Sequence, residues 1–410
     1  MGNNAIDYDG FGCFRPSVAD HCRIEVVIQP DSVLPTTEAP GLERGSDTMR
    51  FLHTADWQIG MKAAHVGAAG DKVRTARIEA IRRIQSLARE KRVDFVLIAG
   101  DTFEHDGVSR AIIDPVLDLL GGFDSEVYLI PGNHDPWMPG GIWEYAKQRC
   151  RKSVHILNES VPLSIAGGTL FPCPLAARWS TEDPTKWIEN RTGEGIRVGL
   201  AHGNLAGLPS NGDLNYPIAQ DAALRGDLDY LALGHWHSFL PFKTGGKLRM
   251  AYSGTPETTA FGEAGSGFVS VVEIDEHGAT PQVDQHKVGA LKWCNIEREI
   301  SQEGEMGALL KELRSEKDAS KVLVRVRLRG LLFAADAALT ATIREYVEQT
   351  FLFGRVDDKD LISAPGDDEW IHNLPDGIIR RSALRLLEQR DSVATHALLE
   401  LYQLVNGGTR

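Results

Sequence analysis

The residues of this chain that are best suited to chemistry stand in five short polar clusters, each after an apolar run. The clusters are Asp56 with Gln58, Asp101, Asn133 with His134, His202, and His235 with His237. The densest is P-G-N-H-D at 131–135, which follows the apolar run 127–130. A core strand has no use for three consecutive polar side chains at its tip, because each costs free energy when buried without a partner. A metal site or a catalytic site does need them.

The apolar runs that precede these clusters predict an α/β fold. Residues 51–55, 95–99 and 127–130 are predicted strands, and amphipathic helices are predicted between them at 71–92 and 111–120. A β-α-β-α-β series implies neighbouring parallel strands with right-handed crossovers. Ligands bind at the carboxyl ends of such strands. We therefore expect the polar clusters to meet along one rim of the sheet system.

After residue 143 the predicted strands become shorter and their connections longer, which indicates a second, mixed sheet. Its predicted strands are 196–201, 229–233, 251–254 and 267–274. The first two end at His202 and at the G-H-W-H motif (234–237), so the second sheet is expected to contribute to the same rim.

Two further segments flank this region. Residues 1–48 lack periodicity and are rich in Gly, Pro, Asp and Ser, so we predict a disordered extension, and Met49 is a candidate start of translation. From about residue 291 a small α+β unit is predicted, with helices at 306–316 and 337–349 around a strand at 321–329. Two amphipathic segments, 378–389 and 393–405, follow it. The strand at 321–329 alternates apolar and basic residues, and its basic side is expected to face solvent.

The composition limits the classes of function. The chain has 410 residues with a net charge of −13, which argues against a general electrostatic DNA-binding surface. Any contact with DNA must be local, helped by metal ions, or shared with a basic partner. Five scattered cysteines without a C-x-x-C pair exclude a disulfide framework and fit a reducing cytoplasm. Neither a signal peptide nor an apolar run of about 18 residues is found, so a cytoplasmic location without membrane association is expected.

The donor set predicts a pair of metal ions. The eight side chains of the clusters comprise two carboxylates, two amides and four imidazoles, which suit Mn, Fe or Zn in a catalytic site. The lack of thiolates argues against a structural zinc site. Four protein ligands suffice for one metal that also binds water, and one shared carboxylate can bridge two ions about 3.5–4 Å apart. His134 would then be free to protonate a leaving alkoxide or to stabilise phosphoryl charge.

Taken in order, the motifs D-x-Q, G-D-x-x-E, G-N-H-D, His202 and G-H-x-H resemble those of the calcineurin-like metallophosphoesterases. More narrowly, F-L-H-T-A-D-W-Q-I-G (51–60) and G-D-T-F-E (100–104) resemble the SbcD branch, the nuclease subunit of SbcCD-type DNA repair complexes. The resemblance covers roughly residues 50–275. It implies a four-layer α/β/β/α sandwich of two mixed sheets at 49–290. A smaller C-terminal α+β cap domain is expected at 291–410.

The resemblance also implies roles for individual residues. One metal would be held by Asp56, Gln58, Asp101 and His237, and the other by Asp101, Asn133, His202 and His235. His134 would be the catalytic histidine, and Mn²⁺ the favoured ion, with Mg²⁺ or Fe compatible. Asp135 either orients a ligating histidine through a hydrogen bond or serves the turn before Pro136, and both readings stay open.

The chain departs from the family at Gln58, where the family usually has histidine in a D-x-H motif. A glutamine oxygen can bind Mg²⁺ or Mn²⁺, but it is a weaker donor than imidazole toward softer metals. The first metal site is therefore expected to be looser or more selective for Mn²⁺. Three tryptophans inside the motifs, Trp57, Trp137 and Trp236, are expected to pack around the site rather than to stack on bases.

The function that the resemblance implies is hydrolysis of DNA phosphodiester bonds by a two-metal exonuclease and endonuclease. It also implies a homodimer and an SMC-like ATPase partner resembling SbcC. Two alternatives remain open. One is a phosphoesterase that acts on a nucleotide or another small phosphodiester, and the other is a DNA-end-binding subunit whose altered first motif has weakened catalysis.

Overall fold

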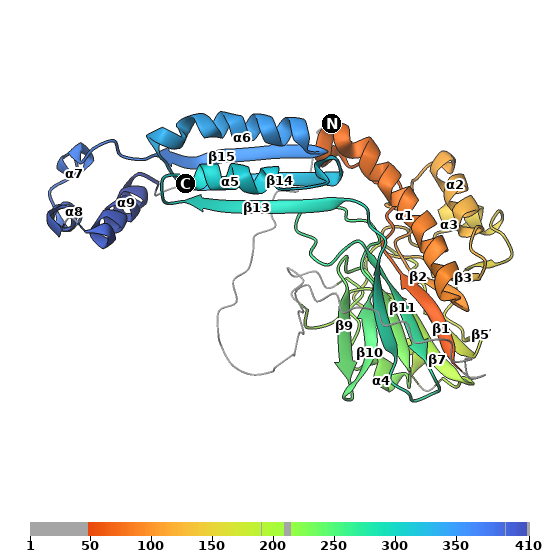
Figure 1. Cartoon of the computed structure of the whole chain (residues 1–410). Helices are drawn as coiled ribbons and strands as arrows, with labels where there is room; N and C mark the ends of the chain where they lie inside the picture. The colour runs from red at the N-terminus through yellow and green to blue at the C-terminus, as the bar shows by residue number, and fades with distance from the viewer. Residues whose placement is uncertain (1–47, 190, 209–214, 390, 408–410) are drawn as a thin grey trace, which may run out of the picture. The chain divides into compact units, whose positions relative to one another are not determined.

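The computed structural model describes residues 48–189, 191–208, 215–389 and 391–407. The disordered extension predicted for residues 1–48 lies outside these ranges, apart from Thr48. Within the described part, the apolar runs of the sequence form two six-stranded mixed sheets and a third, three-stranded sheet (Figure 1).

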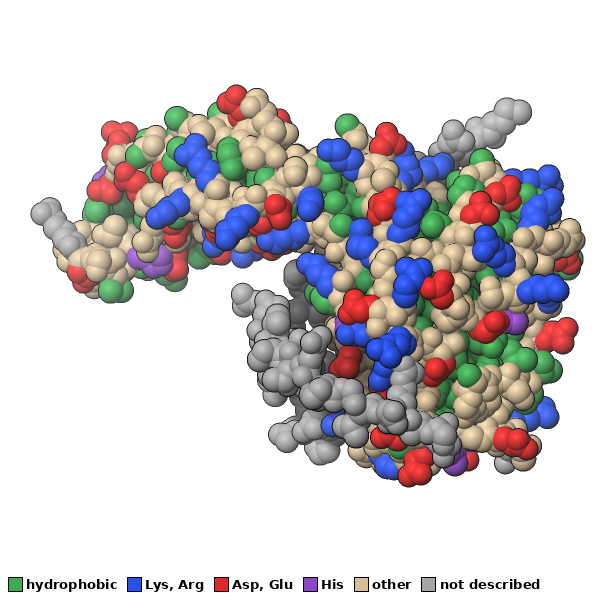
Figure 2. Space-filling view, turned by 45° about the vertical axis from the view of Figure 1, so that its right-hand side comes forward, with side chains coloured by type: hydrophobic (Ala, Val, Ile, Leu, Met, Phe, Trp, Pro, Cys, Tyr) green, Lys and Arg blue, Asp and Glu red, His purple; other side chains and the backbone are tan. Residues whose placement is uncertain are grey.

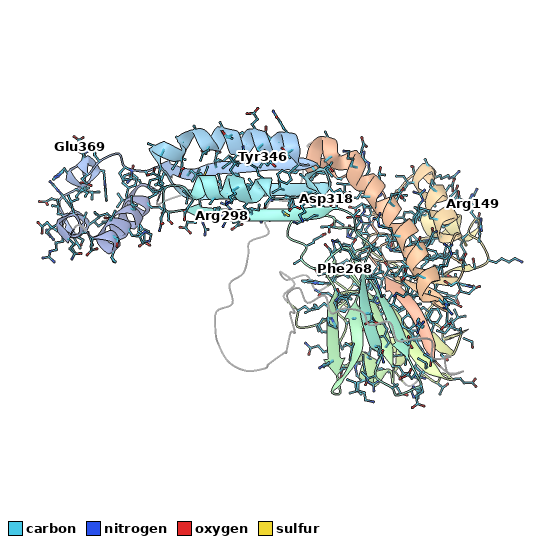
Figure 3. The ribbon with its side chains drawn as sticks, in the orientation of Figure 1. Arg149, Phe268, Arg298, Asp318, Tyr346 and Glu369 are labelled. Atoms are coloured by element: carbon cyan, nitrogen blue, oxygen red, sulfur yellow. The ribbon has the colours of Figure 1, made fainter. Side chains whose placement is uncertain are left out.

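The first sheet has the strand order β12-β11-β1-β2-β3-β4. Its strands are β1 (Met49–Thr54), β2 (Phe95–Ala99), β3 (Glu126–Ile130), β4 (Val154–Ile156), β11 (Phe268–Ile274) and β12 (Gln282–Lys287). Strands β1 to β4 run parallel, as the β-α-β-α-β pattern predicts. Strand β11, which begins at Phe268 (Figure 3), closes the sheet by pairing antiparallel with β1. The strand predicted at 267–274 therefore belongs to the first sheet, and its assignment to the second sheet was wrong.

Three helices cover the outer face of this sheet: α1 (Gly70–Lys91), α2 (Arg110–Leu120) and α3 (Ile142–Lys147). The short η1 (Ala64–Ala69) precedes α1. Helix α1 forms because its apolar residues recur at helical spacing, so that Val73, Ile81 and Ile84 share one face and are fully buried. Burial of each such side chain stabilises the fold by about 1.5–3 kcal/mol.

The second sheet has the order β5-β6-β7-β8-β10-β9. Its strands are β5 (Leu163–Ile165), β6 (Gly168–Cys173), β7 (Ile196–His202), β8 (Tyr230–Gly234), β9 (Leu240–Thr244) and β10 (Lys247–Tyr252). Strands β6, β7, β8 and β10 are parallel. The short elements η2 (Lys186–Ile188) and α4 (Ala222–Arg225) pack on its outer face.

The two sheets pack against each other through an apolar layer built from both. The rings of Phe51 and Phe95 stack with centroids 5.1 Å apart, and Tyr230 of the second sheet meets Phe51 edge-on at 5.7 Å. Helices, sheet, sheet and short outer helices therefore form the predicted α/β/β/α layers. This packing brings the carboxyl ends of strands from both sheets together.

The C-terminal unit contains a three-stranded parallel sheet of β13 (Lys292–Ile300), β14 (Val322–Leu332) and β15 (Phe353–Ser363). Helices α5 (Glu305–Arg314) and α6 (Ala337–Thr350) connect these strands, together with the short η3 (Ala319–Lys321) and η4 (Ala334–Asp336). Both helices pack on one face of the sheet. Figure 3 labels Tyr346 on α6 and Arg298 on β13. One strand, 321–329, was predicted in an α+β unit, whereas the structure has three parallel strands that alternate with helices. The boundary at residue 290 stays a prediction.

The charged face of β14 is exposed, as predicted. Arg325, Arg327 and Arg329 alternate with buried apolar residues, and two of these arginines form ion pairs across the strands. Arg327 pairs with Asp360 at 2.8 Å, and Arg329 pairs with Glu299 at 3.2 Å. The helices α7 (Glu369–His372), α8 (Ile378–Gln389) and α9 (Ser392–Gly407) follow the sheet.

None of the helices in the described part of the chain has the length and apolar character that a membrane span requires. The cysteines of this part, Cys150, Cys173 and Cys294, are free thiols.

Candidate metal centre

The predicted site residues lie at or just after the ends of five strands, three from the first sheet and two from the second. Asp56 and Gln58 follow β1, Asp101 follows β2, Asn133 and His134 follow β3, His202 ends β7, and His235 and His237 follow β8. The loops approach one another closely at two glycines. A Cβ on Gly132 would lie 2.1 Å from Asp101 Oδ1, and one on Gly234 would lie 1.9 Å from the Ala99 oxygen. Larger residues at these two positions would force the loops apart.

The backbone of these loops is strained at the candidate ligands themselves. Eight non-glycine residues in the described part of the chain have a positive φ, and four of them are candidate ligands. The four are Asp56 (φ 55°), Gln58 (φ 44°), Asp101 (φ 51°) and His235 (φ 111°). Such conformations cost about 1–3 kcal/mol each and persist only where the surrounding structure holds them in place. Strain concentrated in this way marks a functional site rather than a set of ordinary turns.

Asp56, Asp101 and His202 form a cluster with one ligand atom of each within 4.8 Å of the others. All three side chains are buried. His202 Nε2 lies 3.4 Å from Asp101 Oδ2, and its Nδ1 lies 2.8 Å from the Ala99 carbonyl oxygen. With Nδ1–H donated to that carbonyl, Nε2 is directed at the cluster, which is the tautomer that a metal-binding histidine needs.

Asn133 and His235 extend this cluster. Asn133 Oδ1 lies 2.8 Å from His202 Nε2 and 3.1 Å from His235 Nδ1. The backbone N–H of His235 donates to both oxygens of Asp56 at 3.1 Å. One amide oxygen and two imidazole nitrogens therefore converge on a single point beside two carboxylates.

Gln58 and His237 form a second pair at the same rim. Gln58 Nε2 lies 3.0 Å from His237 Nε2, and turning the amide by 180° would place its oxygen there instead. His237 Nδ1 lies 2.7 Å from Glu263 Oε1. Glu263 therefore accepts a hydrogen bond from the Nδ1–H of His237, and the Nε2 lone pair of His237 faces Gln58.

His134 is the exposed member of the set, with 42% of its side chain accessible. Its Nδ1 lies 3.0 Å from the carbonyl oxygen of Glu104, and its Nε2 lies 3.9 Å from Asp101 Oδ2. The backbone N–H of His134 also donates to Asp101 Oδ1 at 3.0 Å. A fixed, partly open imidazole beside a buried cluster can contact a substrate that the buried groups cannot reach.

The electrostatics of the cluster require positive charge. Burial raises the pKa of Asp56, and the neighbouring Asp101 carboxylate raises it further, while His202 and His237 oppose this shift. Burial also acts to raise the pKa of Asp101, but His202 and His134 hold it well below its usual range. The pKa of His202 is raised to about 9, because Asp101 and Asp56 outweigh the lowering effect of burial. Two buried carboxylates next to each other are stable only with cations, either protonated imidazoles or metal ions, beside them.

The donor set fits divalent metal ions. Several acceptor atoms face one another here: carboxylate oxygens, imidazole nitrogens with oriented lone pairs and an amide oxygen. They do not have enough protons between them for every acceptor to receive a hydrogen bond. This is the mixture that Mn²⁺, Fe²⁺ or Zn²⁺ binds, and the oxygen donors also suit Mg²⁺. The identity of the metal stays a prediction, as do the roles of the individual residues.

Asp135 and Glu263 have roles that the sequence did not settle. The carboxylate of Asp135 accepts the backbone N–H of Gly132 at 2.7 Å and of Phe103 at 2.8 Å. These bonds hold the G-N-H-D and G-D-T-F-E loops together, which favours the turn role. Glu263 was not among the candidates, because it lies 26 residues after His237 in a segment without a motif. Only the hydrogen bond to His237 in the folded structure identifies Glu263 as part of the site.

Comparison with known proteins bears on the family of the domain that contains these residues. Residues 49–239 match the family model of the calcineurin-like phosphoesterases. A curated relative, the uncharacterized metallophosphoesterase YhaO of Bacillus subtilis (strain 168), is 25% identical over 203 residues. That match covers 46% of this chain and 48% of the relative, so the chain spans about half the length of the protein it matches.

Among solved structures, GAP50, the anchor in the inner membrane complex of Plasmodium, is similar, with 11% sequence identity and a TM-score of 0.36. The match covers 59% of this chain and 85% of that chain, and a likeness this distant carries no argument about function. The family match stands on its own. The findings support a calcineurin-like metallophosphoesterase domain at residues 49–239.

Proposed function

We propose that the chain is a two-metal phosphodiesterase of the SbcD type, which hydrolyses DNA phosphodiester bonds as an exonuclease and endonuclease. The observation that carries the proposal is the convergence of five strand-end clusters on Asp56, Asp101 and His202, with His134 open to solvent beside them. The motifs at 51–60 and 100–104 favour the SbcD branch over other members of the family.

In this proposal Asp56, Gln58, Asp101 and His237 hold one ion, and Asp101, Asn133, His202 and His235 hold the other. Bound divalent ions would supply a more acidic water and neutralise charge on the phosphate oxygens. The buried carboxylates and the oriented imidazoles provide a rigid set of donors, so little reorganisation is needed when the ions bind.

His134 protonates the leaving alkoxide in this proposal. Water attacks phosphorus, the bond to the leaving oxygen breaks, and the alkoxide needs a proton. In the protonated ring, Nδ1–H donates to the Glu104 carbonyl, which leaves Nε2–H available to the alkoxide. Proton donation of this kind contributes about 10²–10⁴-fold to a rate.

The charge of the chain supports a shared mode of DNA binding. The net charge is −13, and Figure 2 shows acidic and basic side chains interspersed on the face in view rather than one basic surface. The arginines of β14 at positions 327 and 329 are already paired with carboxylates. We therefore propose a cytoplasmic homodimer that obtains much of its DNA affinity from an SMC-like ATPase resembling SbcC.

Two other functions are distinguished by experiment. A small nucleotide or other phosphodiester would use the same ions and the same histidine. A DNA-end-binding subunit with weakened catalysis is favoured by one specific feature, glutamine in place of the family's usual histidine at position 58.

The test combines metal content with cleavage by the purified full-length protein and its His134→Ala variant. With Mn²⁺, we expect cleavage of linear duplex DNA and a loss of at least about 100-fold in the variant, with metal content retained. Hydrolysis of a small chromogenic diester without cleavage of DNA would favour the first alternative. DNA binding without cleavage, with turnover restored by Gln58→His, would favour the second.

A further inference from the structure

Trp179 is the one aromatic residue that is exposed in the described part of the chain, with 61% of its surface accessible. The motif tryptophans behave differently, since Trp57 is buried and Trp137 and Trp236 pack against the apolar clusters. An aromatic side chain left in water forgoes the large hydrophobic gain of burying its ring. Its exposure leaves the face of the Trp179 ring free to contact a ligand.

The backbone around Trp179 is held rigidly. Tyr216 Oη donates to the carbonyl of Ala177 at 2.8 Å, and Asn215 Nδ2 donates to that of Arg178 at 2.9 Å. On the other side, the N–H of Ser180 donates to Asn215 Oδ1 at 3.1 Å, and the N–H of Tyr216 donates to the Ser180 carbonyl at 2.8 Å. The indole is thus presented to solvent from a fixed segment, which lowers the entropic cost of binding a ligand.

The same segment is tied to the loops of the candidate metal centre. Leu175 donates its N–H to the Pro131 carbonyl at 3.3 Å and accepts the N–H of Trp137 at 2.8 Å, so it flanks the G-N-H-D motif on both sides. The carbonyl of Tyr216 accepts the N–H of Asn204 at 3.1 Å, two residues after His202.

A third connection runs to the G-D-T-F-E loop. The guanidinium of Arg178 pairs with the carboxylate of Asp106, five residues beyond Asp101. Trp179 therefore lies on a segment fixed to three of the loops that carry candidate ligands.

We propose that Trp179 stacks on a nucleobase next to the scissile phosphate and so makes the site selective for nucleic acid over simple diesters. Stacking on an exposed indole accepts any base, because every base has a π-face, and this suits a nuclease without sequence preference. The immediate surroundings favour a base over a protein partner. Trp179 is flanked by the exposed Arg178 and two exposed alanines rather than by a continuous large apolar patch.

This inference rests on the proposed nuclease function. The test uses the Mn²⁺-loaded full-length protein and a short single-stranded DNA oligonucleotide with one hydrolysable linkage. In one substrate the two nucleotides that flank this linkage carry normal bases, and in the other substrate both nucleotides are abasic. The quantity compared is the ratio of kcat/KM for the two substrates, because a purely structural defect lowers both rates and leaves the ratio unchanged.

For Trp179→Ala we expect the ratio to fall by about five-fold or more, the loss that removal of one stacking contact predicts. Trp179→Phe should restore most of it. The matched control is Leu224→Ala on α4, a residue that is 53% exposed, and it should keep the ratio of the native chain. An unchanged ratio in Trp179→Ala, with the enzyme active, would overturn the stacking role alone. Failure of the native chain to cleave either oligonucleotide would overturn the nuclease proposal as well.

Discussion

The role of Glu263 gives the sharpest test of the candidate metal centre. Glu263 Oε1 lies 2.7 Å from His237 Nδ1, and its Oε2 accepts the backbone N–H of Thr259 at 2.7 Å. The carboxylate therefore fixes the ring of His237 and directs its Nε2 toward Gln58, where the proposal places one metal ion. Glu263→Gln keeps the size of the side chain and removes its charge.

The size of the effect follows from the contact that is weakened. A hydrogen bond to a charged group contributes about 1.5–3 kcal/mol, and about 1.4 kcal/mol corresponds to a factor of ten in affinity. We therefore expect a loss of about 10–100-fold in metal affinity, the range that is typical for partners of metal-binding histidines. The loss should concern one of the two binding steps, because His237 is assigned to one ion only.

The assay is calorimetric titration of Mn²⁺ into protein freed of metal with EDTA. The matched control is Glu257→Gln in the same segment. Glu257 is buried, and its carboxylate accepts the N–H of Ala290 at 2.7 Å and of Leu291 at 3.0 Å. This variant should lower stability and leave both binding steps unchanged. Glu263→Gln with native affinity at both steps, or an equal loss in Glu257→Gln, would refute the reasoning.

Three further predictions concern the site and its support. Gln58→His should raise metal affinity at one step, because imidazole is a stronger donor than an amide oxygen, and an unchanged or lower affinity in the same titration would contradict this. Mn²⁺ should raise the melting temperature of the native chain but not that of Asp101→Asn, whose shared carboxylate is lost; equal shifts in thermal scans would argue against a bridging role. Burial lowers the pKa of His53 from 6.5 to about 3, while its ring nitrogens lie 3.0 Å from Tyr230 Oη and 3.2 Å from the Leu233 carbonyl oxygen. Below pH 6.5 the unfolded chain binds a proton at His53 that the folded chain does not. The free energy of unfolding therefore decreases as the pH is lowered, by about 2 kcal/mol at pH 5 relative to neutral pH. His53→Gln should flatten this dependence in urea unfolding of the metal-free protein, and an equally steep dependence in both proteins would contradict it.

Much of the site could be predicted from the sequence, because its ligands follow directly on strands. An apolar run such as 95–99 must be buried, so the polar residue that follows it emerges at the sheet edge, and the fold needs no further information to place Asp101 there. The same reasoning located His202, although the residue proved to be the last of β7 rather than the first of a loop.

The remaining features depend on contacts that no local pattern encodes. Glu263 reaches His237 only because the segment before β11 returns to the rim, and Trp179 is held by residues more than 30 positions away. Strand β15 was missed for a different reason. It is an edge strand with polar residues such as Asp357 and Asp360, so it lacks the apolar run by which buried strands are recognised.

The division of the candidate ligands between two sheets has a consequence for how activity arises. Asp56, Gln58, Asp101 and Asn133 come from the amino-terminal sheet, whereas His202, His235 and His237 are supplied about 70 residues or more later in the chain. A polypeptide that ends before β7 has the candidate carboxylates and amides but none of the three candidate imidazole ligands. The full set of candidate ligands is thus present only after the second sheet has been synthesised and has docked on the first.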